Sequence, residues 1–318
     1  MTTASPPLSP PWSRRVGTMG AVVLGLVLLV AAYAKLIHPE GFVEQIAAEK
    51  LDLLFSARAV AFLALALEVA LGLALVSGIR RLWVLIPASL LVAFFLFLTG
   101  RSWYREAHGL STADGSCGCF GNLVERTPKE AFFQDLALLV PALGLAFFGR
   151  GGRQPFPRWR AACIALATMA SLAFAWKAPD LPLDDLATRL KPGVRVADIC
   201  TGQGSERVCL DFVLPEALKG EHAVVMMDLT SEKAAAAVPA LNAYATGASG
   251  PSLWALSAAE GEQMHRFYWE RGPLFEIREA PPSLLKPLYR RLPRSFLVRD
   301  GLVVETYSSL PPLARLAG

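Results

Sequence analysis

Long apolar runs dominate the first half of the chain and constrain its fold more than any other feature. They cover residues 16–36, 57–77, 83–100, 131–148 and 159–176. A helix that crosses a bilayer needs about 20 mostly apolar residues, so the pattern predicts an α-helical transmembrane bundle of about five helices. Only 18% of the residues are charged, against about 25% in a typical soluble domain, which also indicates a membrane protein.

The first run has a second interpretation, a cleavable signal peptide. Arg14 and Arg15 precede it, and the sequence Ala-Ala-Tyr-Ala at residues 31–34 resembles a cleavage site. The apolar core of a signal peptide is about 7–15 residues long. Because this run is longer and further runs follow it, we favour a retained helix. Residues 1–15 begin with a stretch rich in Ser and Pro and are expected to form a disordered tail.

Arginines in the loops predict the orientation of the bundle. If five helices cross in turn, one side receives Arg14, Arg15, Arg80, Arg81, Arg150, Arg153, Arg158 and Arg160. That side is expected to be cytoplasmic, because short cytoplasmic loops are enriched in Lys and Arg. The basic residues of the loop after residue 100 dissent mildly. The N-terminus is then cytoplasmic and the chain after residue 176 is periplasmic, where oxidising conditions permit disulfides.

Two cysteines, Cys117 and Cys119, lie one residue apart in the polar segment between the third and fourth runs. Three neighbouring glycines supply the backbone freedom that a tight turn needs. A disulfide closed over one residue is strained, and strained disulfides are labile and oxidising, which favours redox chemistry. A structural bridge is one alternative. A metal half-site with His108 is another, although zinc usually takes four ligands with wider Cys spacing.

Glu68 lies in the middle of the second run, where a carboxylate costs about 2.5–3.5 kcal/mol. It is therefore expected to face the bundle interior, to be protonated or to be paired. Two roles stay open: a partner for protons or a quinone headgroup, and an interhelical hydrogen bond. Lys35 is a further candidate for the first role, although a lysine at the end of a span usually extends to the interface. Cys163 is expected to be a small core residue.

Several of these residues together resemble the MauE/DoxX-like membrane family. The resemblance covers residues 16–150 and rests on Ala34-Lys35-Leu36, His38-Pro39, Phe42, Glu68, Gly72, Gly78 and Cys117-Gly-Cys-Phe-Gly121. It implies a four-helix, redox-associated membrane domain whose dithiol is Cys117 and Cys119, and it marks Glu68 and Lys35 as family positions of unknown role. MauE is linked to maturation of the disulfide-rich methylamine dehydrogenase, and DoxX relatives are linked to quinone-coupled oxidation.

After residue 178 the pattern changes to alternating strands and helices, which predicts an extracytoplasmic α/β domain over residues 178–318. Strands are expected at 194–200, 207–213, 223–229, 252–256, 274–278, 295–299 and 302–307, and helices at 231–244, 261–270 and 282–289. Asp300-Gly301 predicts a tight turn between the last two strands.

This order of elements and the sequence around Pro293 resemble the thioredoxin-like fold of TlpA-type proteins over residues 190–312. The resemblance implies that Pro293 is in cis and faces the active site. It also places the family's Cys-x-x-Cys at residues 231–234, where this chain has Ser231 and Ala234. A hydroxyl and a methyl cannot exchange a disulfide, so this domain is not expected to be a thiol oxidoreductase by itself.

Cys200 and Cys209 flank a turn between two predicted strands. A structural disulfide is favoured there, and closing this loop would stabilise the fold by about 2.7 kcal/mol. A redox-active pair that exchanges with Cys117 and Cys119 is one alternative, and two free thiols are the other.

These features predict a membrane-embedded thiol/disulfide redox factor of the bacterial inner membrane. Cys117 and Cys119 would pass electrons between an extracytoplasmic client protein with thiols and a membrane carrier, for which quinone is the candidate cofactor. The alternative is a non-catalytic assembly factor or chaperone, whose thioredoxin-like domain binds the client and whose helices are an anchor. No nucleic acid is expected as a partner, because the net charge of +4 lies mostly in short loops and reports topology. No metal is expected, because the spacing of Cys117 and Cys119 is narrower than that of a zinc site and His108 is the one other obvious ligand nearby.

Overall fold

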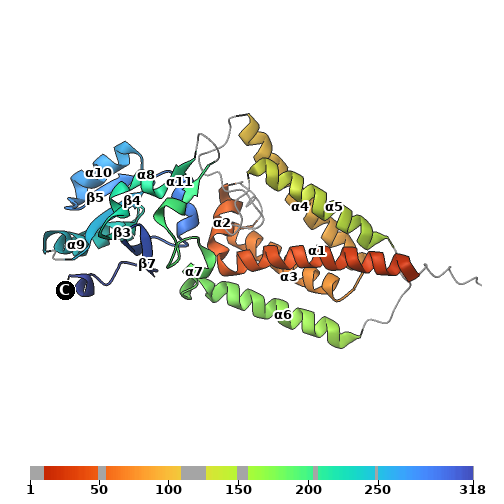
Figure 1. The fold of residues 1–318 in the computed structure, drawn as a ribbon. Helices are drawn as coiled ribbons and strands as arrows, with labels where there is room; N and C mark the ends of the chain where they lie inside the picture. Colours follow the sequence, from red (N-terminus) through yellow and green to blue (C-terminus); the bar gives the residue numbers. More distant parts are fainter. Residues whose placement is uncertain are drawn as a thin grey trace, which may run out of the picture. The chain divides into compact units, whose positions relative to one another are not determined.

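The computed structural model describes residues 11–48, 55–108, 127–148, 157–202, 207–247 and 250–317. The chain divides into two compact units, Met1–Leu181 and Pro182–Gly318, each of which is considered by itself (Figure 1). The first unit is helical, and the second combines helices with a β-sheet.

The described residues of the first unit include five helices that are long and apolar enough to cross a membrane, which confirms the predicted number of spans. They are α1 (Pro11–Ile37), α3 (Ala57–Val76), α4 (Leu82–Ala107), α5 (Pro128–Phe147) and α6 (Arg158–Lys177). Helix α1 contacts α3, α5 and α6, so it is the element around which the bundle packs.

The start of α1 differs from the expectation of a disordered tail over residues 1–15. The helix begins at Pro11, so residues 11–15 are helical, and residues 1–10 lie outside the described part. Proline suits the first position of a helix, because its fixed φ is helical and its missing N–H has no partner to lose.

A short helix, α2 (Pro39–Ala48), follows α1 and was not predicted. Its Phe42 and Ile46 pack on Ala61 and Ala64 of α3. Ten residues are too few to be a stable helix alone, so this element depends on the packing that the bundle provides.

Glycines let α1 approach two of its neighbours closely. A Cβ on Gly25 would lie 2.8 Å from the carbonyl oxygen of Gly72 on α3, and one on Gly20 would lie 2.7 Å from that of Ala142 on α5. Small residues at such crossings are the usual means of close helix packing in membranes.

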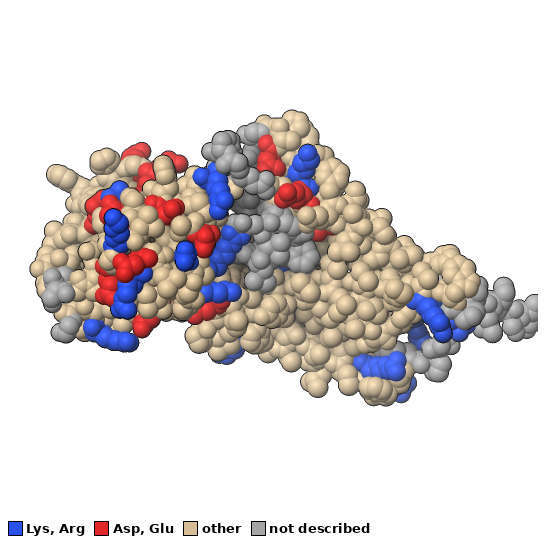
Figure 2. All heavy atoms as spheres, in the orientation of Figure 1, with Lys and Arg blue, Asp and Glu red and all other residues tan. Residues whose placement is uncertain are grey.

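Helix α6 shows little burial, because only 17% of its apolar window is covered within the structure. Cys163 on this helix is an exposed free thiol, so the expectation that it packs in the core is wrong. Figure 2 shows a broad surface free of Lys, Arg, Asp and Glu over the long helices of the first unit, as lipid-facing helices require.

The second unit is an α/β domain with a five-stranded mixed sheet of order β5-β4-β3-β6-β7, which confirms the predicted class. The strands are β3 (Glu221–Met226), β4 (Ser252–Ser257), β5 (Glu276–Glu279), β6 (Arg294–Arg299) and β7 (Leu302–Tyr307). Strands β3, β4 and β5 are parallel, and β6 is antiparallel to both β3 and β7.

Side chains that alternate along β3 give the sheet two apolar faces. Val224 and Met226 belong to a core completed by residues 190–217 and by α11 (Pro282–Leu285). Val225 belongs to the opposite core. The helices that complete this second core are α9 (Glu232–Gly247) and α10 (Gly261–Arg271).

The strands expected at 194–200 and 207–213 are largely absent from the described chain. What forms is a separate hairpin of β1 (Cys200–Thr201) and β2 (Val208–Cys209), followed by a helical turn, α8 (Leu210–Val213). Residues 194–196 bond instead to the turn and start of β7, through Val303 N–H to Val194 O and Val196 N–H to Gly301 O, both 2.9 Å. This non-local partner replaces the local pairing that the sequence suggests.

The helix expected at 282–289 is also shorter than predicted. It forms one turn of α-helix, α11, and then the 3₁₀ turn η6 (Lys286–Leu288). Pro287 lies inside this stretch, and its missing N–H and ring disfavour a continuous α-helix.

Candidate functional site

Cys117 and Cys119 lie outside the described residues, between the end of α4 and the start of α5. Near these two helix ends, Trp103 of α4 stacks on Phe132 of α5 with ring centroids 5.4 Å apart, and it meets the edge of Phe133 at 5.2 Å. The two helix ends that flank the cysteine segment are therefore packed side by side.

A salt bridge joins Lys35 on α1 to Glu68 on α3 inside the bundle. The two side chains are 4% and 0% exposed. The ammonium also lies over two aromatic rings, 4.8 Å from the centroid of Phe42 on α2 and 4.9 Å from that of Phe95 on α4. Four helices thus meet at one buried cation, where a cation–π contact is strongest because it is desolvated.

This geometry corrects one expectation. Lys35 does not extend to the interface, because a carboxylate and two aromatic rings surround its ammonium inside the bundle. Glu68 is paired, which is one of the three states expected for a carboxylate at this depth. Its Oε1 accepts from Lys35, whereas its buried Oε2 has no hydrogen-bond partner among the described residues.

A second buried carboxylate, Asp135 on α5, is 4% exposed and was not predicted from the sequence. The signal was available, because a lone Asp within an apolar run carries the same meaning as Glu68. The contacts of Lys35 with Phe42 and Phe95 were also not predicted. They join helices that come from separate segments of the sequence, so only the packing of the bundle reveals them.

Arginines collect at the end of the bundle where α1 begins. Arg80, from the turn between α3 and α4, donates to the carbonyl oxygen of Phe148 at 3.4 Å, next to Gly17 of α1. Burial lowers the pKa of Arg80, and the nearby charge of Arg14 lowers it further. At this end Figure 2 shows blue atoms without red ones. Arg14 of α1 and Arg80 of the turn between α3 and α4 therefore share one end of the unit.

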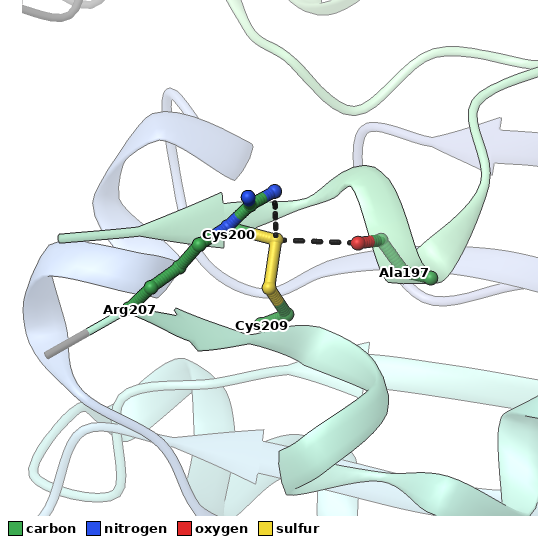
Figure 3. Close-up of a disulfide and its surroundings, with 4 residues drawn as sticks. All are labelled: Ala197, Cys200, Arg207 and Cys209. Atoms are coloured by element: carbon green, nitrogen blue, oxygen red, sulfur yellow. Dashed lines mark hydrogen bonds between the residues drawn. A yellow bond between two sulfur atoms is a disulfide. The ribbon is translucent and has the colours of Figure 1, made fainter. Parts of the chain in front are cut away.

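In the second unit, Cys200 and Cys209 are joined by a disulfide across the β1–β2 hairpin, where they are directly opposed. Figure 3 shows that the guanidinium of Arg207 and the carbonyl of Ala197 both point at the sulfur of Cys200. The distances to that sulfur are 3.3 Å from Arg207 Nη2 and 3.2 Å from Ala197 O. Both cysteines are half-buried.

Ser231 and Ala234 lie at the start of α9, just after the carboxyl end of β3. Ser231 Oγ accepts from Ala234 N–H at 3.2 Å and donates to Asp228 O at 2.8 Å, which is the pattern of a helix N-cap. These hydrogen bonds organise the turn, and neither side chain can carry electrons.

Pro293 lies at the same end of the sheet, where β3 ends and β6 begins. The Leu292–Pro293 peptide is cis, and the next residue, Arg294, is paired in register with Met226 at the end of β3. The turn that starts α9 follows this end of β3, so Pro293 and Ser231 both lie at this end of the sheet.

Arg294 is 1% exposed and fixes the segment around Pro293. Its guanidinium donates to Thr188 Oγ1 (2.5 Å), Leu288 O (2.6 Å), Asp185 Oδ1 (3.1 Å) and Leu190 O (3.2 Å). Burial lowers the pKa of Arg294, and Asp184 and Asp185 partly offset this. A buried charge with this many partners is a strong structural tie.

The described part of the chain contains no group of three or more His, Cys, Asp and Glu side chains that could hold a metal ion. The polar clusters of this part are ion pairs and hydrogen-bond networks.

Comparison with known families bears on the first unit. Residues 13–148 match the model of the family described as methylamine utilisation protein MauE. The membrane unit is MauE-like. The match ends at Phe148, so it includes α1 to α5 and the cysteine segment, and leaves out α6 and the whole α/β domain. No curated protein matches the chain.

Proposed function

We propose that this chain is a membrane-embedded thiol/disulfide redox factor that supports disulfide formation in an extracytoplasmic client, as in methylamine dehydrogenase maturation. The observation that carries the proposal is the match of residues 13–148 to the MauE family. The matched segment contains Cys117 and Cys119 between two packed helix ends. In this proposal the site is a thiol-disulfide oxidoreductase centre.

The proposed reaction is a two-electron exchange. A client thiolate attacks one sulfur of a Cys117–Cys119 disulfide, the S–S bond breaks, and the other cysteine leaves as a thiolate. A second client thiolate then displaces the remaining cysteine from the mixed disulfide. The client gains one disulfide, and the loop gains two electrons and, on protonation, two protons.

We propose a supporting role for Lys35 and Glu68, which is to fix the packing of α1, α3 and α4. Phe95 contacts Lys35 and lies 12 residues before the end of α4, which is about 18 Å along a helix. The pair therefore acts on the cysteine segment through the position of α4, and the proposal requires no direct contact between the pair and a thiol.

Quinone stays a prediction for this site. Lys35 and Glu68 are 4% and 0% exposed, so a quinone ring could reach them only if Phe42 or Phe95 moved. The described residues therefore do not fit a quinone headgroup as they stand, and we derive no step through one.

We propose further that the second unit is a thioredoxin-like domain that binds the client. Three observations support this: the sheet order with β6 antiparallel to its neighbours, α9 directly after β3, and the position of Pro293 directly before β6, opposite the end of β3. Ser231 and Ala234 replace the thiols of the family, so the domain would recognise the client and not oxidise it at that position.

The test is the double variant Cys117→Ala/Cys119→Ala in a host that makes the methylamine dehydrogenase small subunit. We expect loss of oxidised client, followed by thiol alkylation, with an unchanged amount of the variant in the membrane. Cys163→Ala is the matched control, because Cys163 is a free thiol of the same unit. If the double variant still supports oxidation, the redox proposal fails and the non-catalytic assembly factor replaces it.

A further inference from the structure

We propose that the Cys200–Cys209 disulfide is itself exchangeable, and that an incoming thiolate attacks Cys209 and releases Cys200. This deepens the proposed function, on which it rests for the presence of client thiols. It assigns a second site of thiol exchange to the unit whose family-type thiols are missing.

Access to the bond is the first argument. Both cysteines are half-buried, and their hairpin has two residues in each strand. The hairpin is separate from the five-stranded sheet. Exchange at this hairpin therefore does not require the five-stranded sheet to open, whereas a disulfide enclosed by a core would first require unfolding.

Charge is the second argument, and it sets the direction. Arg207 Nη2 lies 3.3 Å from Cys200 Sγ, and a cation beside a sulfur stabilises its thiolate. In thiol–disulfide exchange the better leaving group is the thiol with the lower pKa. Cys200 is therefore the expected leaving group, and Cys209 is the expected point of attack.

The carbonyl of Ala197 supports the same assignment. A disulfide sulfur has no hydrogen to donate, so the 3.2 Å contact between Cys200 Sγ and Ala197 O becomes a hydrogen bond only after reduction, when Cys200 is a thiol. Cys200 thus has a partner for each reduced form, Arg207 for the thiolate and Ala197 for the thiol. In the described part of the chain, both polar contacts of the disulfide fall on Cys200.

The exchange balances without a further reagent. A client thiolate bonds to Cys209 Sγ, the S–S bond breaks, and its electron pair stays on Cys200. A second client thiolate then displaces Cys209, which leaves the client oxidised and the hairpin as a dithiol. Return to the disulfide requires another protein disulfide as oxidant, and the Cys117–Cys119 disulfide of the proposed function is one of this class.

The experiment uses the full chain in detergent, with Cys117→Ala, Cys119→Ala and Cys163→Ala, which leaves Cys200 and Cys209 of the five cysteines. The oxidised protein is mixed with millimolar glutathione, quenched with an alkylating reagent and mapped by peptide mass spectrometry. We expect mixed disulfide within minutes, with glutathione on Cys209 in about threefold excess over Cys200, because attack follows the better leaving group.

Arg207→Gln tests the cause of this preference. A rise of about one unit in the pKa of the leaving thiol should slow the exchange about threefold and reduce the preference for Cys209. Arg266→Gln is the matched control, since Arg266 is an exposed arginine of the same unit, paired with Glu262, and should change neither quantity.

Two results would overturn the proposal. One is glutathione on Cys200 in equal or greater amount. The other is a bond that stays intact for hours in glutathione, as a structural disulfide does. If the alanine background does not fold, the same peptide map of the natural chain separates the cysteines. Because the assay scores adducts on Cys200 and Cys209 alone, its failure leaves the test of the proposed function at Cys117 and Cys119 independent.

Discussion

Lys35 and Glu68, 33 residues apart in the chain, form a salt bridge that joins α1 to α3 in the interior of the helical unit. Two buried charges require each other, because loss of either partner leaves an uncompensated ion. The pair should therefore show a large coupling free energy in a double-mutant cycle.

Lys35→Met and Glu68→Leu should each destabilise the helical unit by about 3–5 kcal/mol, because each strands one buried charge. The double variant Lys35→Met/Glu68→Leu should regain most of that loss, because apolar residues of similar size replace both ions. Thermal unfolding in detergent and a double-mutant cycle measure the coupling.

The surface pair Arg299 and Glu221 is the control for this cycle. Its side chains are 58% and 39% exposed, and exposed pairs contribute about 0–1 kcal/mol. A coupling for Lys35 and Glu68 no larger than that of the control would contradict the buried pair.

Gly25→Ala should weaken the crossing of α1 and α3. The added Cβ would lie 2.8 Å from the carbonyl oxygen of Gly72 and 2.9 Å from the backbone nitrogen of Val76, and overpacking of this kind costs about 1–3 kcal/mol. A lower midpoint of thermal unfolding is the expected result. Gly144→Ala is the control, because a Cβ there meets nothing within 4 Å; equal midpoints for the two variants would refute the close crossing.

Tyr307 should make the α/β domain sensitive to high pH. Burial, together with the hydrogen bond that its hydroxyl donates to Glu305, raises its pKa to about 12, against about 10 in the unfolded chain. A raised folded pKa means that the folded state holds the proton longer. The stability from this group is thus complete below pH of about 10 and is lost as pH rises towards about 12.

The check is the unfolding midpoint of the natural chain and of Tyr307→Phe across this pH range. The variant should lose less stability on going from about pH 9 to about pH 12, because its ring cannot ionise. Tyr33→Phe, an exposed position on α1, should follow the natural chain. If the unfolding midpoint changed with pH in the same way for all three proteins, ionisation of Tyr307 would not be the cause of the loss of stability.

Membrane orientation follows from the arginines gathered at the end where α1 begins, which we propose is cytoplasmic. A periplasm-dependent reporter fused after Gly318 should be active, and one fused at Gly151 should be inactive. A cytoplasmic reporter at the same two positions should give the reverse. An active cytoplasmic reporter at Gly318 would place the α/β domain in a reducing compartment and remove the case for client oxidation.

Much of the fold follows from periodicity and composition, which are local. The five apolar runs became five helices, and the buried run at 223–229 became β3, because a segment that buries its side chains must pair its backbone N–H and C=O groups within a helix or a sheet. The Cys200–Cys209 disulfide also lies where two short strands oppose each other across a turn.

What the sequence could not supply depends on contacts between distant segments. Val194 pairs with β7, more than 100 residues later, and no local sequence pattern predicts this pairing. Lys35 has its carboxylate and two rings on three other helices, so its burial emerges only from packing. Arg207 acquires significance only once the hairpin places its guanidinium beside Cys200.

The hydrogen bonds of Arg294 affect how the end of the sheet near Pro293 can bind another molecule. The guanidinium joins β6 to residues 185–190 and to the carbonyl of Leu288, so these segments are held in one arrangement before any partner arrives. Association costs free energy for each flexible group that becomes ordered, and a surface that is already rigid avoids part of that cost. A peptide that binds at this end of the sheet would therefore lose mainly its own conformational freedom. Its affinity should increase with the fraction of the free peptide that already has the bound conformation.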